Sequence, residues 1–211
     1  MRNIWKNHEP RCLAEHRCRA HADYDNLNGK QVLRESLLNE QGGICAYCMQ
    51  RIRAVVGGMK IEHWHCKDRY PSEQLVYANL LGVCLGGEGR PKIGQHCDTY
   101  KRNDDFCRNP AHPAHDVEGV IRYLGDGRIK ANDKIFDHEI NEVLNLNHPL
   151  LVNNRKAVLK GFQESLARMG NLGATSIQRK ISEWSQPAGG NLEPFCMVVV
   201  YWLRKKLARV G

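Results

Sequence analysis

The segment MKIEHWHC, residues 59–66, places a glutamate directly before a histidine and adds a second histidine and a cysteine within the next three positions. A neutral histidine with a pKa near its ordinary value of about 6.5 can take a proton from water at physiological pH. An adjacent carboxylate can bind a divalent cation. Because Glu–His pairs also occur on solvated strands, the residues around Glu62 and His63 decide whether this segment is reactive or only polar.

Four cysteines give the segment a context. Cys45-Ala-Tyr-Cys48 has the C-x-x-C spacing with which one tight turn presents two thiolates to a tetrahedral zinc ion. Cys84 and Cys97 form a second pair, although twelve residues separate them where two to four are usual. The sequence therefore predicts a structural Zn²⁺ site, closed to water, at these four cysteines. The alternative ligands are Cys66, His96 and Cys107.

The composition is that of an ordinary globular protein. The 211 residues are 42% hydrophobic and 26% charged, so a core can form without disulfides, and nine cysteines favour metal binding. The net charge of +8 favours a polyanionic partner such as nucleic acid. The segment MRNIWKNHEPRC lacks the apolar stretch of a secretory signal, and the longest apolar run, FCMVVVYWL, is about half a membrane span. We therefore expect a cytoplasmic protein without a membrane partner.

The elements around the cysteines are predicted from periodicity and turn signals. Apolar residues at helical spacing predict a helix over 31–41. The segment 43–64 predicts two short strands that turn at Gly57-Gly58, with the C-x-x-C pair at the start of the hairpin and Glu62-His63 on the returning strand. A flexible Gly-rich insertion is expected after Cys84, and a helix is expected to begin near Asp98.

The remainder of the chain predicts a second hairpin and a helical lobe. The segment GVIRYLGDGRIK alternates around Gly125-Asp126-Gly127 and predicts the hairpin. A 3.6-residue apolar period predicts helices over 158–169 and 177–184, and Pro194 is expected in the first turn of a last helix. The fold class is therefore α+β. Its expected regions are an N-terminal arm (1–30), a zinc-stabilised core (31–108) and the hairpin with the helical C-terminal region (109–211).

The order of Glu62-His63, Asn79 and Asp98 around the predicted zinc site resembles the HNH endonucleases, which have a ββα-metal fold. The resemblance implies that Glu62 and Asp98 hold a catalytic Mg²⁺ or Mn²⁺ ion. It also implies that His63 is the general base and that Asn79 braces the loop between the strands. Lys101 matches a basic residue that often follows one turn later in that family.

The third position of the motif departs from the family. HNH proteins often have Cys-His or Cys-Asn before the helix, whereas this chain has Cys97-Asp98 with His96 on the other side. A carboxylate suits magnesium or manganese better than an imidazole does, which favours Asp98 as the ligand. Which of Asp98 and His96 points toward Glu62 is open in the sequence.

A wider set of segments is similar to the HNH proteins of Septu anti-phage systems (PtuB) and their relatives encoded beside retrons. The resemblance covers roughly residues 30–165. It implies a role in anti-phage defence and a partner ATPase of the PtuA type, with a retron reverse transcriptase and its DNA as further partners in the relatives. The segments that carry it are LLNEQGGICAYCMQRI, IEHWHC, NLLGVC, HCDTYK, LNLNHPLLVNNR and the second hairpin.

The function expected from these features is hydrolysis of phosphodiester bonds, in DNA first and in RNA such as tRNA as the alternative substrate. The residues expected to contact nucleic acid are His65, Arg90, Lys92, Lys101 and Arg102. A second class of function is a non-catalytic zinc module that binds nucleic acid or protein, but such a module needs no Glu-His pair beside its zinc. A thiol redox protein would require a thioredoxin-like βαβ context, which this sequence lacks.

Overall fold

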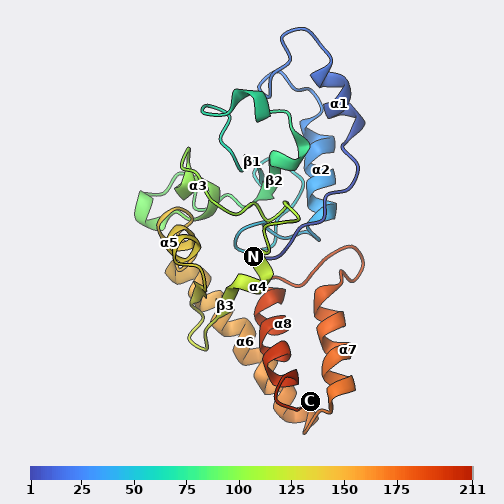
Figure 1. The fold of residues 1–211 in the computed structure, drawn as a ribbon, viewed down its shortest axis with the longest axis vertical. Coiled ribbons are helices and arrows are strands. Elements are labelled where there is room, and N and C mark those ends of the chain that lie inside the picture. The colour runs from blue at the N-terminus through green and yellow to red at the C-terminus, as the bar shows by residue number, and fades with distance from the viewer. Residues whose placement is uncertain (211) are drawn as a thin grey trace.

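The computed structural model describes residues 1–210, so Gly211, the end of the predicted 109–211 region, lies outside the described residues. The chain is a mixture of helices and two small antiparallel hairpins, as the α+β class predicts. Figure 1 shows α1, α2 and the strands β1 and β2 in the upper part, and the helices α6, α7 and α8 in the lower part. The elements of the upper part are α1 (Arg11–Arg17), α2 (Lys30–Glu40), β1 (Lys60–His63), η1 (Pro71–Glu73), η2 (Tyr77–Asn79), β2 (Leu80–Val83), η3 (Lys92–Gly94) and α3 (Cys97–Lys101).

The first hairpin differs from the one expected. β1 pairs antiparallel with β2, so that Glu62 lies opposite Leu81 and His63 lies opposite Leu80. The predicted hairpin around Gly57-Gly58 is wrong, because this segment forms only a local turn and the chain before it makes a single isolated bridge between Ile44 and Arg51. All four residues of β2 are buried, and burial of this apolar strand favours it as the partner of β1.

The free edge of β2 is covered by the segment that follows α2. The side chain of Gln41 accepts a hydrogen bond from the Gly82 N–H at 2.7 Å and donates one to the Gly82 carbonyl at 2.7 Å. The Ala46 N–H, inside the C-x-x-C turn, donates to the same carbonyl at 3.0 Å. The cysteine-bearing turn is therefore attached to the free edge of β2, in the strand pair that carries Glu62 and His63.

The lower part contains α4 (Val117–Val120), β3 (Ile121–Tyr123), β4 (Ile129–Ala131), α5 (Lys134–Glu142), α6 (Pro149–Met169), α7 (Ala174–Ser185) and α8 (Cys196–Leu207). The second hairpin is confirmed, because β3 and β4 pair antiparallel. Its turn requires a glycine at position 127: φ is +90° there, and a Cβ would lie 2.2 Å from the Val152 carbonyl oxygen.

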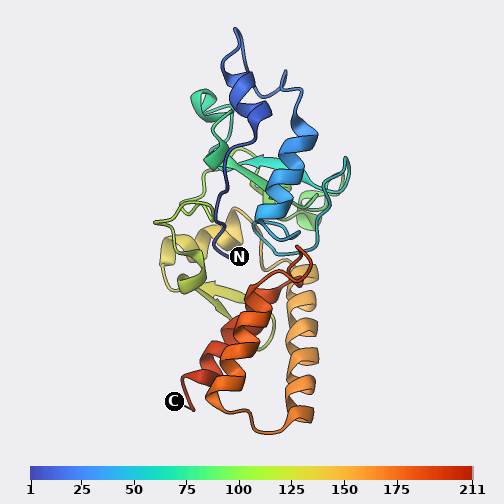
Figure 2. The ribbon, with the colours of Figure 1, turned by 90° about the vertical axis from the view of Figure 1, so that its right-hand side faces the viewer.

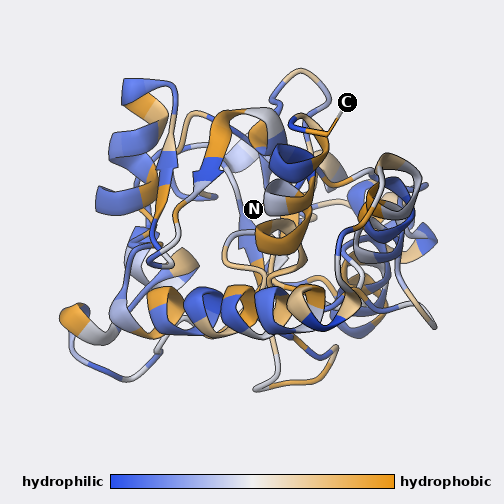
Figure 3. Cartoon of the chain, turned by 90° about the horizontal axis from the view of Figure 1, so that it is seen from below, coloured by the Kyte–Doolittle hydropathy of each residue, from blue (hydrophilic) through white to orange (hydrophobic). Residues whose placement is uncertain are grey.

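The predicted C-terminal helices are present. Figure 2 shows α6, α7 and α8 side by side, and their contact is apolar, with Phe162, Ile177 and Val199 in one buried cluster. Figure 3 shows α8 as hydrophobic over its first turns and hydrophilic near its end. Pro194 precedes the N-cap residue Phe195, so it lies just before the helix and not in its first turn.

The segment FCMVVVYWL belongs mostly to the core, because Met197, Val198 and Val200 are buried. Within residues 1–210, no helix combines the length and the apolar composition needed to cross a membrane.

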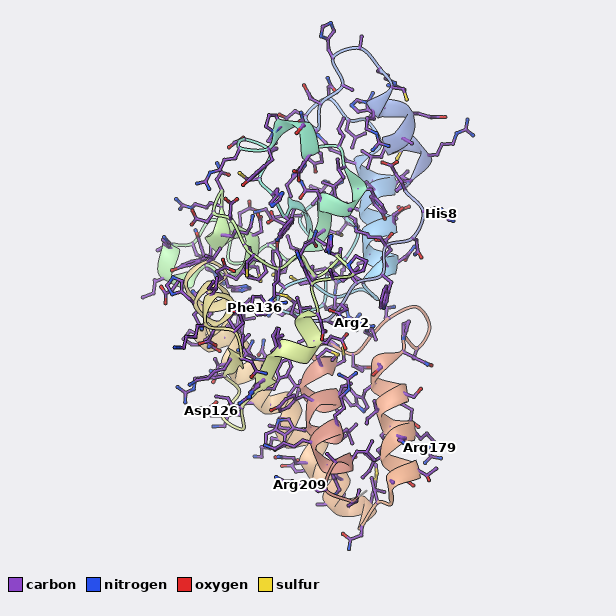
Figure 4. All side chains as sticks on the ribbon, viewed as in Figure 1. Arg2, His8, Asp126, Phe136, Arg179 and Arg209 are labelled. Atoms are coloured by element: carbon purple, nitrogen blue, oxygen red, sulfur yellow. The ribbon has the colours of Figure 1, made fainter. Side chains whose placement is uncertain are left out.

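Aromatic residues connect the lower part to the strand pair. Phe136 on α5, labelled in Figure 4, packs on Phe106 with ring centroids 5.4 Å apart. Phe106 in turn meets the ring of Tyr47 edge-on at 6.0 Å. All three rings are fully buried, and Tyr47 is a residue of the C-x-x-C turn. The position of the C-x-x-C turn is therefore fixed by its hydrogen bond to β2 and by the packing of Tyr47 on Phe106.

Candidate metal centre and active site

The four predicted cysteines converge. Cys45 and Cys48 come from the turn after α2, Cys84 follows β2, and Cys97 is the first residue of α3. All four are buried, and their sulfur atoms lie within 4.8 Å of one another; the Cys48 and Cys84 sulfurs are 3.7 Å apart. A tetrahedral zinc ion with Zn–S bonds of about 2.3 Å places its sulfurs about 3.8 Å apart. The cluster could therefore hold a metal ion such as zinc.

The long Cys84–Cys97 spacing is accommodated by a loop that closes on itself. The His96 N–H donates to the Gly86 carbonyl at 2.9 Å, which returns the chain to the end of β2. At Gly86 φ is +56°, and a Cβ would lie 2.2 Å from the His96 carbonyl oxygen, so the close approach requires glycine. The Cys97 N–H donates to the Leu144 carbonyl at 2.8 Å. Backbone hydrogen bonds thus fix the insertion that the sequence predicts to be flexible.

The alternative ligands lie outside the group of four. Within residues 1–210 these four cysteines are the only set of three or more His, Cys, Asp or Glu residues whose ligand atoms converge, so Cys66 and Cys107 do not contribute. His96 borders the cluster: its Nδ1 atom is 3.2 Å from the Cys97 sulfur and 4.0 Å from the Cys84 sulfur. The imidazole therefore contacts the cysteines, and burial lowers its pKa.

Burial and mutual contact shift the pKa values of the clustered thiols. Burial raises the pKa of the Cys48 and Cys97 thiols well above the ordinary value. Burial also raises the pKa of Cys45, but hydrogen bonds from the other three cysteines outweigh it and hold this pKa well below the ordinary value. A dication that binds thiolates would remove this conflict, because it neutralises several negative charges in one place.

Glu62 on β1 is buried and Asp98 on α3 is partly buried, and the two carboxyl groups share a hydrogen bond, so Asp98 and not His96 lies against Glu62. Burial, and then the hydrogen bond with Asp98 and its charge, raise the pKa of Glu62 well above the ordinary value. Burial also acts to raise the pKa of Asp98, but the hydrogen bond with Glu62 and the charges of Lys60 and Lys101 outweigh it and lower this pKa. The pair is therefore suited to sharing one proton.

Two lysines balance the carboxylates. The Lys101 Nζ atom lies 2.9 Å from Glu62 Oε1, and its side chain is 0% exposed. The Lys60 Nζ atom lies 2.5 Å from Asp98 Oδ2, and its side chain is 29% exposed. Tyr47 donates its hydroxyl to Glu62 Oε1 at 3.1 Å. The prediction that Lys101 contacts nucleic acid is wrong, because its ammonium lies inside the protein and pairs with Glu62.

The donor atoms of this pair fit a hard divalent cation in kind. Carboxylate oxygens are the ligands that Mg²⁺ and Mn²⁺ prefer, and such ions commonly complete their coordination with water and phosphate oxygens. A dication at Glu62 and Asp98 would have to share the carboxylates with the two ammonium groups of Lys60 and Lys101.

His63 is held in one tautomer. Its Nε2 atom lies 3.0 Å from the Gln74 carbonyl oxygen, and since a carbonyl only accepts, Nε2 carries the proton. Nδ1 then bears the lone pair of the neutral ring. Within residues 1–210 this atom has no hydrogen-bond partner, and it keeps some solvent-accessible surface. Burial lowers the pKa of His63, which favours the neutral form.

Asn79 ties the loop between β1 and β2 together. Its Oδ1 atom accepts from the His65 N–H at 2.8 Å, and its Nδ2 atom donates to the carbonyls of His65 at 3.0 Å and Glu73 at 3.2 Å. The side chain is buried. This is the bracing position that the resemblance implies.

The residues expected to contact nucleic acid differ in accessibility. The His65 ring is stacked between Trp64 at 3.9 Å and Tyr70 at 4.3 Å, and its Nδ1 atom lies 2.8 Å from Glu73 Oε2. Both faces of His65 are therefore covered, and only its edge remains for a ligand. Three of these residues lie on the surface: Arg90, Lys92 and Arg102. Arg90 lines a cavity of about 330 Å³ that Cys84 also lines. The Lys92 ammonium lies 5.0 Å from the centre of the Tyr100 ring.

Lys60, Tyr47 and Gln74 are site residues that the sequence did not suggest. The sequence does contain a signal for Lys60. Residues two apart on a strand share a face, so Lys60 is expected on the same face as Glu62. The sequence contains no such signal for the contact of Tyr47 with Glu62 or of the Gln74 carbonyl with His63, since both contacts depend on how the loops pack.

Comparison with known proteins gives no assignment. No model of a known protein family matches the chain, and no curated protein matches it by sequence.

Proposed function

We propose that this protein is a metal-dependent endonuclease of the HNH type that hydrolyses phosphodiester bonds in nucleic acid. In this proposal His63 is the general base, Asn79 braces the loop, and Glu62 and Asp98 hold Mg²⁺ or Mn²⁺. A Zn²⁺ ion in the four-cysteine cluster has a structural role. DNA is the expected substrate, with RNA such as tRNA as the alternative.

The observation that carries the proposal is the environment of His63. A general base needs a free lone pair that water can reach and a pKa that keeps it neutral at physiological pH. The Nε2–H bond to Gln74 leaves Nδ1 as the acceptor, and burial lowers the pKa of the ring. A structural histidine on a strand needs neither property.

The order of the elements supports the HNH type. An antiparallel pair, β1 and β2, is followed by the short helix α3, and the four-cysteine cluster joins the end of β2 to the start of α3. Glu62 and His63 end β1, and Asp98 is in the first turn of α3. A ββα-metal core requires this order of strand, loop, strand and helix.

The proposed reaction uses water as the nucleophile. Nδ1 of His63 takes a proton from a water molecule, whose oxygen forms a bond to phosphorus while the bond from phosphorus to the 3′ oxygen breaks. The leaving oxygen receives a proton from solvent, which gives a 5′-phosphate and a 3′-hydroxyl. When bound, the divalent ion would stabilise the negative charge on the phosphoryl oxygens and on the leaving oxygen.

The biological role proposed is anti-phage defence beside an ATPase of the PtuA type. The support for this role is the resemblance of the segments between residues 30 and 165 to the Septu and retron-associated proteins. The net charge of +8 is compatible with a nucleic-acid substrate.

The test is cleavage of duplex DNA and of tRNA by the purified protein, with and without the ATPase, in Mg²⁺ or Mn²⁺ and with EDTA as a control. Wild type is compared with His63→Ala and with His8→Ala, whose histidine is exposed at the edge of the molecule (Figure 4). We expect EDTA and His63→Ala to abolish cleavage, and His8→Ala to leave it unchanged, at equal zinc content. If His63→Ala cleaves like wild type, the assignment of His63 as the general base is wrong. If wild type cleaves neither substrate, with or without the ATPase, the endonuclease proposal is wrong and a non-catalytic zinc module replaces it.

A further inference from the structure

The two lysines at the carboxylate pair have different freedom to move. Lys101 is fully buried, and its ammonium also donates to the His63 carbonyl at 3.3 Å. It has no route to solvent without a change of fold. The Lys60 side chain, which pairs with Asp98, is 29% exposed. Lys101 is thus a fixed counter-ion of the pair, whereas Lys60 can leave it.

A second carboxylate is within reach of Lys60. Glu88 Oε1 lies 3.7 Å from the Lys60 ammonium, and its side chain is 59% exposed. Glu88 belongs to the loop that the Gly86–His96 hydrogen bond closes, so its backbone has a fixed position relative to α3. The Thr99 hydroxyl, 3.1 Å from the same ammonium, lies beside it. A small rotation of the Lys60 side chain can therefore exchange Asp98 for Glu88.

Charge balance makes this exchange relevant to metal binding. The two ammonium groups carry one charge more than the two carboxylates when these share a proton, and an equal charge when both are ionised. A divalent cation at the pair would therefore add its full charge to a cluster that is not negative. The repulsion between that cation and an ammonium about 4 Å away is large at any effective dielectric constant found in proteins. Departure of Lys60 from Asp98 relieves this repulsion and also frees an oxygen ligand.

We propose that Lys60 is a built-in competitor of the catalytic divalent ion: it neutralises Asp98 while the ion is absent, and it transfers to Glu88 when the ion binds. The inference rests on the proposed function, because it concerns the metal site at Glu62 and Asp98. It adds a role for two residues outside the motif, Lys60 as the group that limits affinity for the cation and Glu88 as the acceptor of the displaced ammonium.

The test is the affinity of the full-length, zinc-loaded protein for Mn²⁺, measured by isothermal titration calorimetry and by the electron paramagnetic resonance signal of free Mn²⁺. We expect Lys60→Met to bind Mn²⁺ at least about tenfold more tightly than wild type, because one competing charge is gone. We expect Glu88→Gln to bind it about threefold more weakly, because the displaced ammonium loses a partner. The double variant should match Lys60→Met within about twofold, since Glu88 acts only through Lys60.

Matched controls separate these effects from net charge. Lys130→Met and Glu142→Gln make the same charge changes at exposed positions on β4 and α5, and both should leave the affinity unchanged. Adding Glu62→Gln to Lys60→Met should abolish the tight binding, which locates it at the carboxylate pair.

Equal Mn²⁺ affinities of wild type and Lys60→Met would overturn the inference. A weaker Mn²⁺ affinity of the double variant than of Lys60→Met would also overturn it, because Glu88 would then act without Lys60. These failures leave the proposed function intact if wild type still cleaves nucleic acid in a metal-dependent manner. Absence of Mn²⁺ binding in wild type and in Lys60→Met, together with absence of cleavage, would overturn both.

Discussion

The Nε2 atom of His63 lies 3.0 Å from the carbonyl oxygen of Gln74, and this contact determines which ring nitrogen can accept a proton. The carbonyl belongs to the loop between β1 and β2, so the orientation of the imidazole depends on the shape of that loop. Asn79 holds the loop through three hydrogen bonds of its buried side chain.

The first prediction concerns this brace. Asn79→Ala removes three hydrogen bonds and leaves the backbone groups of His65 without their partner, so we expect the free energy of unfolding to fall by about 2–3 kcal/mol. Because His63 then loses its fixed orientation, cleavage should fall about tenfold to hundredfold at unchanged zinc content. Urea unfolding and cleavage rates measure the two effects. Asn103→Ala, at an exposed side chain, is the control; a variant at position 79 that cleaves like wild type would contradict the brace.

The second prediction concerns the zinc site. Cys84→Ser should reduce zinc from about one atom per chain toward none and lower the midpoint of thermal unfolding by at least about 10 °C, because binding to such a site stabilises the folded chain directly. Metal analysis and calorimetry measure these changes. Cys18→Ser, at an exposed cysteine, should retain both properties. Retention of zinc by Cys84→Ser would show that the cluster is not the ligand set.

Residue type and spacing were sufficient to predict the cysteine cluster. A C-x-x-C turn together with a second cysteine pair is typical of zinc ligands, and the four cysteines do converge. The twelve-residue insertion obscured the second pair, because its closure depends on the approach of Gly86 to His96 and not on a sequence pattern.

Strand pairing and burial of charge could not be read from the sequence. Gly57-Gly58 has the local chemistry of a hairpin turn, but pairing is decided by which strand buries the more apolar surface, and β2 is buried throughout. Lys101 resembles any solvated lysine in sequence. Its burial follows from the packing of α3 on β1, which places it against Glu62.

The third prediction uses two glycines of the insertion. Gly86→Ala adds a Cβ 2.2 Å from the His96 carbonyl oxygen, which should force the loop open and displace Cys97. Gly89→Ala is a matched control, because φ is also positive there but nothing lies within 4 Å of the added atom. Both variants carry the cost of about 1 kcal/mol for alanine at positive φ. We expect only Gly86→Ala to weaken zinc binding, measured by competition with a chromogenic chelator; equal zinc affinity of the two variants would show that the close approach is unimportant.

The fourth prediction concerns the fixed counter-ion of the carboxylate pair. Lys101→Met leaves Glu62 buried without its nearest positive charge, and breaking one side of a buried ion pair costs about 3–5 kcal/mol. The free energy of unfolding, from urea titration at neutral pH, should fall by that amount. Combining Lys101→Met with Glu62→Gln should restore a large part of it, since the amide carries no charge to desolvate. Lys160→Met, whose lysine pairs loosely with Glu164 on the surface of α6, should change stability by less than about 0.5 kcal/mol. If the Lys101 variant is as stable as wild type, Lys101 does not balance the negative charge of the Glu62–Asp98 pair.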